Sequence, residues 1–278
     1  MDLDTQRHHC ESLLAQQPDD WALARLFLPR EQRDAATALL ALRHEIRRLP
    51  FASEEPGIVN VKLNWWREEI DNAARSHHPI LQLLSANADT ANLESEYLQE
   101  MVDAAEMEFD AGAISNEADR QLYLYRSSGV VAELFARMAS GLDRQQLAIA
   151  RSIGIARGQL DILQTLAHDL PRNVVKIPVS TLEENEIAPA MLGQLAGEKR
   201  AALLRSERDR LDQLRVDART RMADVEPVPA LRVIWRRLEQ DYRLLPRQLE
   251  ELVVTAPAQP GMLRRLWTAW RAARRPIN

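Results

Sequence analysis

Two carboxylates, Asp161 and Asp169, stand out because they lie beside an apolar stripe and not within a run of charges. The stretch from Gly154 to Pro178 predicts one buried helix that leads into a short loop and stops at the proline. Its apolar positions recur every three to four residues, at Ile155, Leu160, Ile162, Leu163, Leu166 and Leu170. Carboxylates in this position either point to solvent or carry chemistry, and the residues alone leave both interpretations open.

Three cations form a second candidate group, at the end of a helix predicted from Glu31 to Leu49. His44, Arg47 and Arg48 occupy its last turns, and Pro50 closes it. Cations at this place interact favourably with the negative end of the helix dipole. A purely structural role is therefore a strong alternative to ligand binding.

The tail from Gly261 to Pro276 has no acidic residue and five arginines, with tryptophans on its apolar side. Such a helix can lie on an anionic membrane surface. Docking of the tail on the acidic body of the protein is at least as good an interpretation. The membrane-surface candidates are Arg264, Arg265, Trp267, Trp270, Arg271, Arg274 and Arg275.

The elements that position these residues are predicted to be helices almost throughout. The chain has 278 residues and only 9 glycines, and it is rich in alanine, leucine, arginine, glutamate and glutamine. This composition favours an all-α fold. Further helices are predicted over residues 19–29, 59–74, 80–85, 93–109, 119–142, 188–225 and 230–254.

Two of these helices have distinctive patterns. The helix at 119–142 is apolar almost all round and is predicted to be central and buried. Ser127, Ser128 and Gly129 in its middle would let another backbone or a ligand approach closely. The helix at 93–109 ends in an acidic run that includes Glu108, and these charges are predicted to form a solvated face.

Charge and composition exclude several classes of protein. A formal net charge of −5 gives no general reason to expect nucleic acid. The single cysteine, Cys10, excludes an internal disulfide framework and fits a reducing compartment. The polar N-terminus is not typical of a secretory signal, and no apolar run is long enough to span a bilayer. These features predict a cytoplasmic protein that can lie peripherally on a membrane.

Known phosphate-loop, dinucleotide-binding, serine-hydrolase and zinc-ligand motifs are absent from the sequence. A site, where there is one, must then be built between helices.

Four segments resemble the squalene and phytoene synthase family, and they occur in the family's order. They are residues 21–42, the run LNWWREEI at 63–70 followed by HHP, residues 123–142, and the stretch 154–178. The resemblance covers roughly residues 20 to 180. It implies an all-α isoprenoid synthase fold, with residues 1–278 in one domain around a central cavity and residues 261–278 as a basic tail.

Enzymes of this family hold magnesium ions against a prenyl diphosphate with two aspartate-rich motifs. Hard Mg²⁺ takes carboxylate oxygens and neutralises the leaving diphosphate. Without gaps, the resemblance places the aspartates of the first motif at Arg47, Arg48 and Phe51. It places those of the second motif at Thr165 and Asp169, so one carboxylate of the five remains.

This loss implies poor magnesium binding, which the adjacent arginines would weaken further. No cofactor is therefore expected. Asp161 falls where the family usually has an uncharged amide. The segments EIRR, EEPGI and ILQTLAHDLPRN are similar to a branch that includes mitochondrial complex I assembly factors related to phytoene synthase.

Three hypotheses follow for function. The first is a synthase-like protein without catalysis, which binds a lipid or isoprenoid or assists assembly of a membrane complex with a protein partner. The second is an active prenyl diphosphate transferase, which would use Mg²⁺ and in which His44, Arg47 and Arg48 bind diphosphate directly. The third is a helical interaction module with a filled interior.

Overall fold

The computed structural model describes residues 2–16, 19–53, 55–87, 93–110, 114–141, 143–169, 174–195, 197–251 and 262–277. Within these ranges the chain forms helices and short helical turns and no strand, which confirms the predicted all-α class. Leu170 of the predicted stripe and Gly261 of the tail lie outside the described residues. No helix in the described ranges combines the length and the apolar character needed to cross a membrane.

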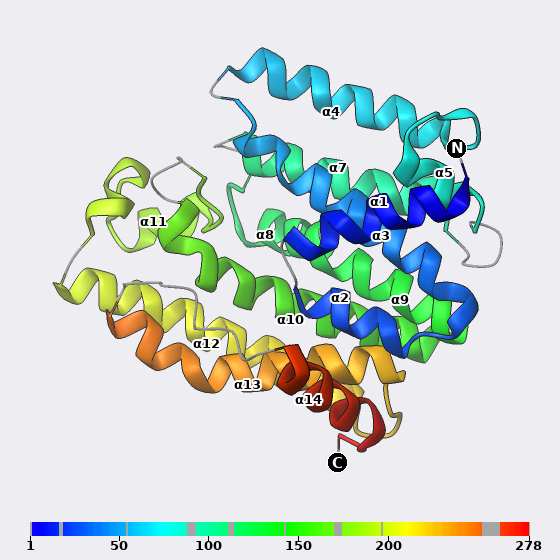
Figure 1. The fold of residues 1–278 in the computed structure, drawn as a ribbon. Coiled ribbons are helices and arrows are strands. Elements are labelled where there is room, and N and C mark those ends of the chain that lie inside the picture. The colour runs from blue at the N-terminus through cyan, green and yellow to red at the C-terminus, as the bar shows by residue number, and fades with distance from the viewer. Residues whose placement is uncertain are drawn as a thin grey trace.

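Figure 1 shows the helices and the order in which they follow one another along the chain. They are α1 (Leu3–Gln16), α2 (Asp20–Ala24), α3 (Arg33–Arg47), α4 (Pro56–Asp71), α5 (Pro79–Ser85), α7 (Ser95–Phe109), α8 (Glu117–Leu124), α9 (Val130–Ser140), α10 (Arg144–Asp169), α11 (Val179–Glu184), α12 (Gly197–Arg221), α13 (Pro229–Glu251) and α14 (Met262–Arg274).

Helix α10 is the central element, and it packs against α9, α12 and α13. It also packs against a π-helical turn, Tyr125–Gly129, which joins α8 to α9 within the helix predicted over 119–142. A Cβ atom at Gly154 would lie 2.6 Å from the carbonyl oxygen of Ser128 and 2.8 Å from the Cα atom of Gly129. Only glycine fits at 154, and the close backbone approach predicted at Ser128 and Gly129 is confirmed.

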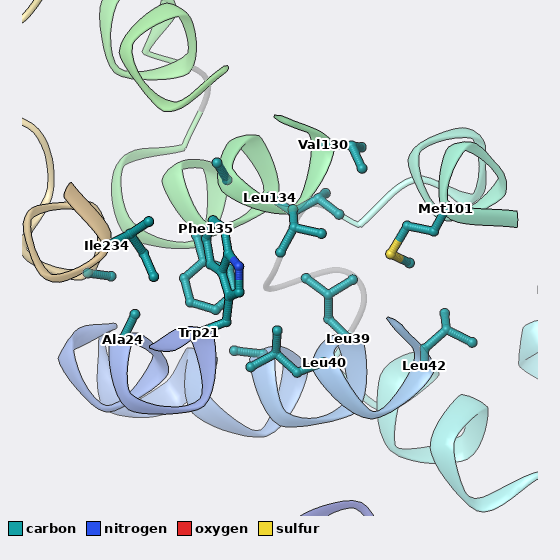
Figure 2. Close-up of a cluster of buried hydrophobic side chains, with 14 of the residues drawn as sticks. Trp21, Ala24, Leu39, Leu40, Leu42, Met101, Val130, Leu134, Phe135 and Ile234 are labelled. Carbon is teal, nitrogen blue, oxygen red and sulfur yellow. The ribbon is translucent and has the colours of Figure 1, made fainter. Parts of the chain in front are cut away.

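The main hydrophobic core lies between α2, α3, α9 and α13 (Figure 2). The rings of Trp21 and Phe135 meet edge to face there, with centroids 5.3 Å apart. Asp19 caps α2 by accepting a hydrogen bond from the backbone N–H of Ala22 at 2.8 Å, as an N-cap residue does. The cap fixes where α2 begins, and it places the following residue, Asp20, close to α10 and α13.

Helix α1 was not among the helices predicted from the sequence. Its sequence is mostly polar, but Gln6, Cys10, Leu13 and Leu14 share one face and are buried. That face packs against α3 and α5. The burial depends on tertiary contacts that the local pattern does not reveal.

Candidate functional site

One face of α10 carries a polar stripe of Arg157, Asp161, Thr165 and Asp169. These residues are four apart, so they stack on the same side of the helix. The neighbouring face holds apolar residues of the core, including Leu160. Helix α10 therefore presents both carboxylates singled out from the sequence in one line.

Asp169 is 3% exposed and engaged by three neighbours. Its Oδ2 atom accepts hydrogen bonds from the Thr165 hydroxyl at 2.6 Å and from Lys176 Nζ at 3.0 Å. Its Oδ1 atom lies 3.1 Å from Nδ1 of His168. Burial acts to raise the pKa of Asp169, but the charge of Lys176 and these hydrogen bonds outweigh it and lower the pKa below 3.8.

Lys176 also reaches a second buried carboxylate. Its Nζ atom lies 3.5 Å from Glu108 Oε2, and the Tyr123 hydroxyl donates to Glu108 Oε1 at 2.5 Å. Burial and the charge of Glu108 raise the pKa of Tyr123 well above 10, so the phenol keeps its proton and donates. The prediction that Glu108 belongs to a solvated acidic face is wrong, because Lys176 and Tyr123 compensate its charge inside the protein.

Asp161 belongs to an adjoining cluster centred on Arg157. Arg157 pairs with Asp161 at 2.8 Å, with Asp241 of α13 at 2.9 Å and with Asp20 of α2 at 3.5 Å. Arg237 completes the cluster by donating to Asp20 at 2.9 Å. Burial acts to lower the pKa of Arg157, but the three carboxylates raise it overall. Asp161 therefore does not point free into solvent.

Of the first-motif positions, Arg47 is half-buried, while Arg48 and Phe51 are exposed. Arg48 is exposed and pairs with Glu45 at 3.3 Å. The Phe51 ring meets the His168 ring edge to face, with centroids 5.8 Å apart, so the ends of the two motif segments lie together. His44 is half-buried, and burial, with the charges of Arg48 and Arg47, lowers its pKa below 6.5.

Arg47 differs in burial and in pairing from Arg48, its neighbour in the chain. It is half-buried, and it makes no hydrogen bond or ion pair with any residue in the described part of the chain. Burial acts to lower its pKa, but the carboxylates of Asp161 and Glu108 raise it overall. Its guanidinium thus remains charged with donors available to an anion.

The residues of the site do not fit the magnesium ions of the family. Mg²⁺ requires several oxygen ligands in octahedral geometry. The first-motif positions offer two guanidinium groups and a ring, while Thr165 offers a hydroxyl and Asp169 is bound by Lys176. In the described ranges no group of three or more His, Cys, Asp or Glu side chains could hold a metal ion.

Sequence reasoning missed the residues that complete the site: Lys176, Glu108, Tyr123 and Arg157. The spacing of Arg157 and Asp161 was an available signal, because oppositely charged residues four apart on a helix pair. Lys176 and Glu108 carried no such signal, since tertiary packing alone brings them to Asp169.

Helix α14 exposes most of the residues predicted to face a membrane. Arg265 is the exception: it is 6% exposed, and it donates to the carbonyl oxygen of Asp19 at 3.5 Å. It lies on the docked side of the helix, so its place among the membrane-surface candidates was wrong. The others lie exposed or half-exposed, namely Arg264, Trp267, Trp270, Arg271, Arg274 and Arg275.

The chain belongs to the squalene/phytoene synthase family, whose sequence profile matches residues 14–265. It is 26% identical over 156 residues to a phytoene synthase of Mycobacterium tuberculosis, covering 56% of this chain and 52% of that protein. It is 25% identical over 210 residues to a Drosophila melanogaster homolog of assembly factor 6 of NADH dehydrogenase (ubiquinone) complex I, covering 72% of this chain and 59% of that protein.

Among solved structures, a dehydrosqualene synthase in complex with ligand shares the fold, with a TM-score of 0.79 and 14% sequence identity. The similarity covers 97% of this chain and 96% of that one. The fold therefore agrees with the resemblance of the sequence to this family.

Proposed function

We propose that this protein is a non-catalytic member of the squalene/phytoene synthase family that assists assembly of a membrane complex and binds a lipid or isoprenoid between its helices. The observation that carries the proposal is the ion pair between Lys176 and Asp169. An internal ammonium group holds the one carboxylate that remains of the family's metal ligands.

The energetics of this pair oppose metal-dependent prenyl transfer. A divalent ion at Asp169 would have to displace Lys176, which is buried and also faces Glu108. Removing one partner of a buried ion pair costs about 3–5 kcal/mol. In return magnesium would gain a single carboxylate ligand, that of Asp169, which is too few ligands to offset that cost.

The relatives support the role in assembly. The fly relative carries the name of a complex I assembly factor, and its match covers more of this chain than that of the mycobacterial synthase does. By this proposal the protein works in the cytoplasm at a membrane surface, with a protein partner there and with an isoprenoid or other lipid as a ligand.

Turnover and lipid content of the purified full chain test the proposal. Incubation with farnesyl or geranylgeranyl diphosphate and Mg²⁺ should release no diphosphate above the rate without protein. Organic extraction followed by mass analysis should recover a co-purifying isoprenoid or lipid. Diphosphate release that Asp169→Asn abolishes would overturn the lack of catalysis, and a preparation without lipid would overturn the ligand.

One observation favours a second candidate, a site for prenyl diphosphate as in an active transferase. Arg47 offers donors that no described residue takes up, and the carboxylates of Asp161 and Glu108 act on its charge. Calorimetry with farnesyl diphosphate separates the candidates. This second function predicts that Arg47→Ala abolishes binding while Arg48→Ala, at the neighbouring exposed position, preserves it; equal affinity in both variants would exclude it.

A further inference from the structure

We propose that the outward face of α14 docks on an anionic phospholipid bilayer, and that a groove between α13 and α14 takes a lipid phosphate. The inference deepens the proposed function, from which it takes only the membrane setting. The inference uses none of the residues around Asp169 and Arg47, so it and the proposed function rest on separate observations.

The two faces of α14 are the reverse of what packing would favour. The docked face buries small side chains, Ala269, Ala272 and Ala273, together with Arg265. The bulky apolar side chains point away from the body: Leu263 is 84% exposed, Trp267 55% and Trp270 46%. Large apolar side chains normally supply the buried area of a helix, so a face that exposes them is typical of a contact surface.

Each exposed tryptophan on this face carries a cation. The guanidinium of Arg271 lies 4.4 Å from the centroid of the Trp267 ring, and that of Arg274 lies 4.5 Å from that of Trp270. Tryptophan is enriched at the boundary between lipid headgroups and acyl chains. Arginine beside it can keep its charge at headgroup level while its stem lies along the apolar surface.

The groove beside this face has the lining expected of a phosphate site. It has a volume of about 460 Å³ and is lined by Arg236 of α13 and by Arg271, Arg275 and Thr268 of the C-terminal segment, along with Ala272 and Pro276. Arg236 donates to the carbonyl oxygen of Pro276 at 2.6 Å, which ties the end of the chain to α13.

Arginine is well suited to phosphate oxygens because its donors form a fixed fork. No carboxylate lines the groove in the described part of the chain. The acidic residue that approaches this end of the chain, Glu226, accepts the backbone N–H of Ile277 at 2.9 Å. The arginines of the groove therefore keep their charge for an anionic ligand.

A bilayer fits this surface better than another anionic partner does. Leu263, Trp267 and Trp270 require an apolar phase next to the negative charges, which lipid provides and a nucleic acid backbone does not. Residues 262–277 contain no acidic side chain, whereas the whole chain carries a net charge of −5. An anionic bilayer would attract α14 and repel the acidic remainder, which fixes one orientation.

Vesicle flotation of the full chain tests the inference. The protein should float with phosphatidylcholine vesicles that contain phosphatidylglycerol, float poorly with phosphatidylcholine alone, and be released at about 0.5 M salt. Arg271→Gln together with Arg274→Gln should lower the partition constant about 25-fold, roughly five-fold for each charge. Trp267→Ala with Trp270→Ala should lower it at least ten-fold, since interfacial apolar area is lost.

Matched controls keep the result interpretable. Trp65→Ala removes a tryptophan of similar exposure on α4, and Arg205→Gln removes an exposed arginine on α12, so both should preserve flotation. Circular dichroism and thermal melting would establish that all variants fold. Unchanged flotation of the α14 variants, equal loss in the controls, or binding to RNA without binding to vesicles would overturn the inference. Diphosphate turnover by the protein would overturn the proposed function and leave this inference standing.

Discussion

Two polar clusters adjoin helix α10, and they differ in how completely their charges are paired. In the cluster between α8, α10 and α12, Glu207 of α12 is 1% exposed. Nη1 of Arg120 in α8 donates to both of its oxygens, at 2.7 and 2.6 Å, and Gln159 of α10 donates to it at 2.9 Å. The stripe from Arg157 to Asp169 forms the other cluster. Its charges are also paired, but it borders Arg47, which has no direct partner among the described residues.

This difference in pairing distinguishes a cluster that stabilises the packing of helices from a cluster that can bind a ligand. A buried network whose donors and acceptors meet one another specifies how helices pack. A half-buried guanidinium without a hydrogen bond or ion pair contributes little to packing, and it marks where a ligand can bind. The resemblance places the family's second aspartate motif in this second cluster, where Lys176 pairs with Asp169.

The largest expected change in stability lies in the fully paired cluster of Arg120, Glu207 and Gln159. Arg120→Met should destabilise the protein by about 3–5 kcal/mol, because Glu207 would keep its charge in a buried place without a cation. Denaturant unfolding monitored by circular dichroism would measure the change. Arg205→Met, which breaks an exposed pair with Glu198, should stay within about 0.5 kcal/mol; comparable losses in the two variants would refute the distinction.

A smaller loss of stability is expected when the ammonium group between Asp169 and Glu108 is removed. Lys176→Met should cost about 2–4 kcal/mol, since Asp169 and Glu108 lose their shared cation but keep the hydroxyl groups of Thr165 and Tyr123 as donors. The same unfolding measurement applies. A neutral result would mean that Lys176 does not compensate these carboxylates.

Acid should lower the stability of the folded protein by protonating Asp169. The pKa of Asp169 is lower in the folded state than its ordinary value of 3.8, so the folded state holds the charge that the unfolded state loses first. Its contribution to stability is complete above about pH 4 and disappears as the pH falls through the folded pKa. Asp169→Asn should therefore flatten the acid limb of the unfolding free energy. An unchanged limb would contradict the pairing.

The smallest effect on stability is expected at Arg47. Arg47→Ala should change the free energy of unfolding by less than about 1 kcal/mol, because no ion pair is lost. Arg157→Ala in the neighbouring α10 stripe is the matched comparison. It would leave Asp20, Asp161 and Asp241 without their shared cation and should cost several times more. Equal costs at the two arginines would show that Arg47 is a structural cation.

The sequence was sufficient for the class of fold and for the helix that carries the site, because the apolar residues of α10 recur every three to four positions. The resemblance also implies which family ligands are missing, since that comparison is made position by position. The sequence could not reveal that Lys176 and Glu108 meet at Asp169, or that Arg265 turns inward. Those outcomes depend on distances between helices, which no local pattern encodes.

Magnesium binding measured by calorimetry tests the central claim most directly. The full chain would be titrated with MgCl₂ in the presence of a non-hydrolysable farnesyl diphosphate analogue, and Asp169→Asn would be titrated in parallel. The proposal that Lys176 takes the place of magnesium predicts no specific magnesium binding in the native protein and an identical trace for the variant. Stoichiometric binding that disappears in Asp169→Asn would contradict it.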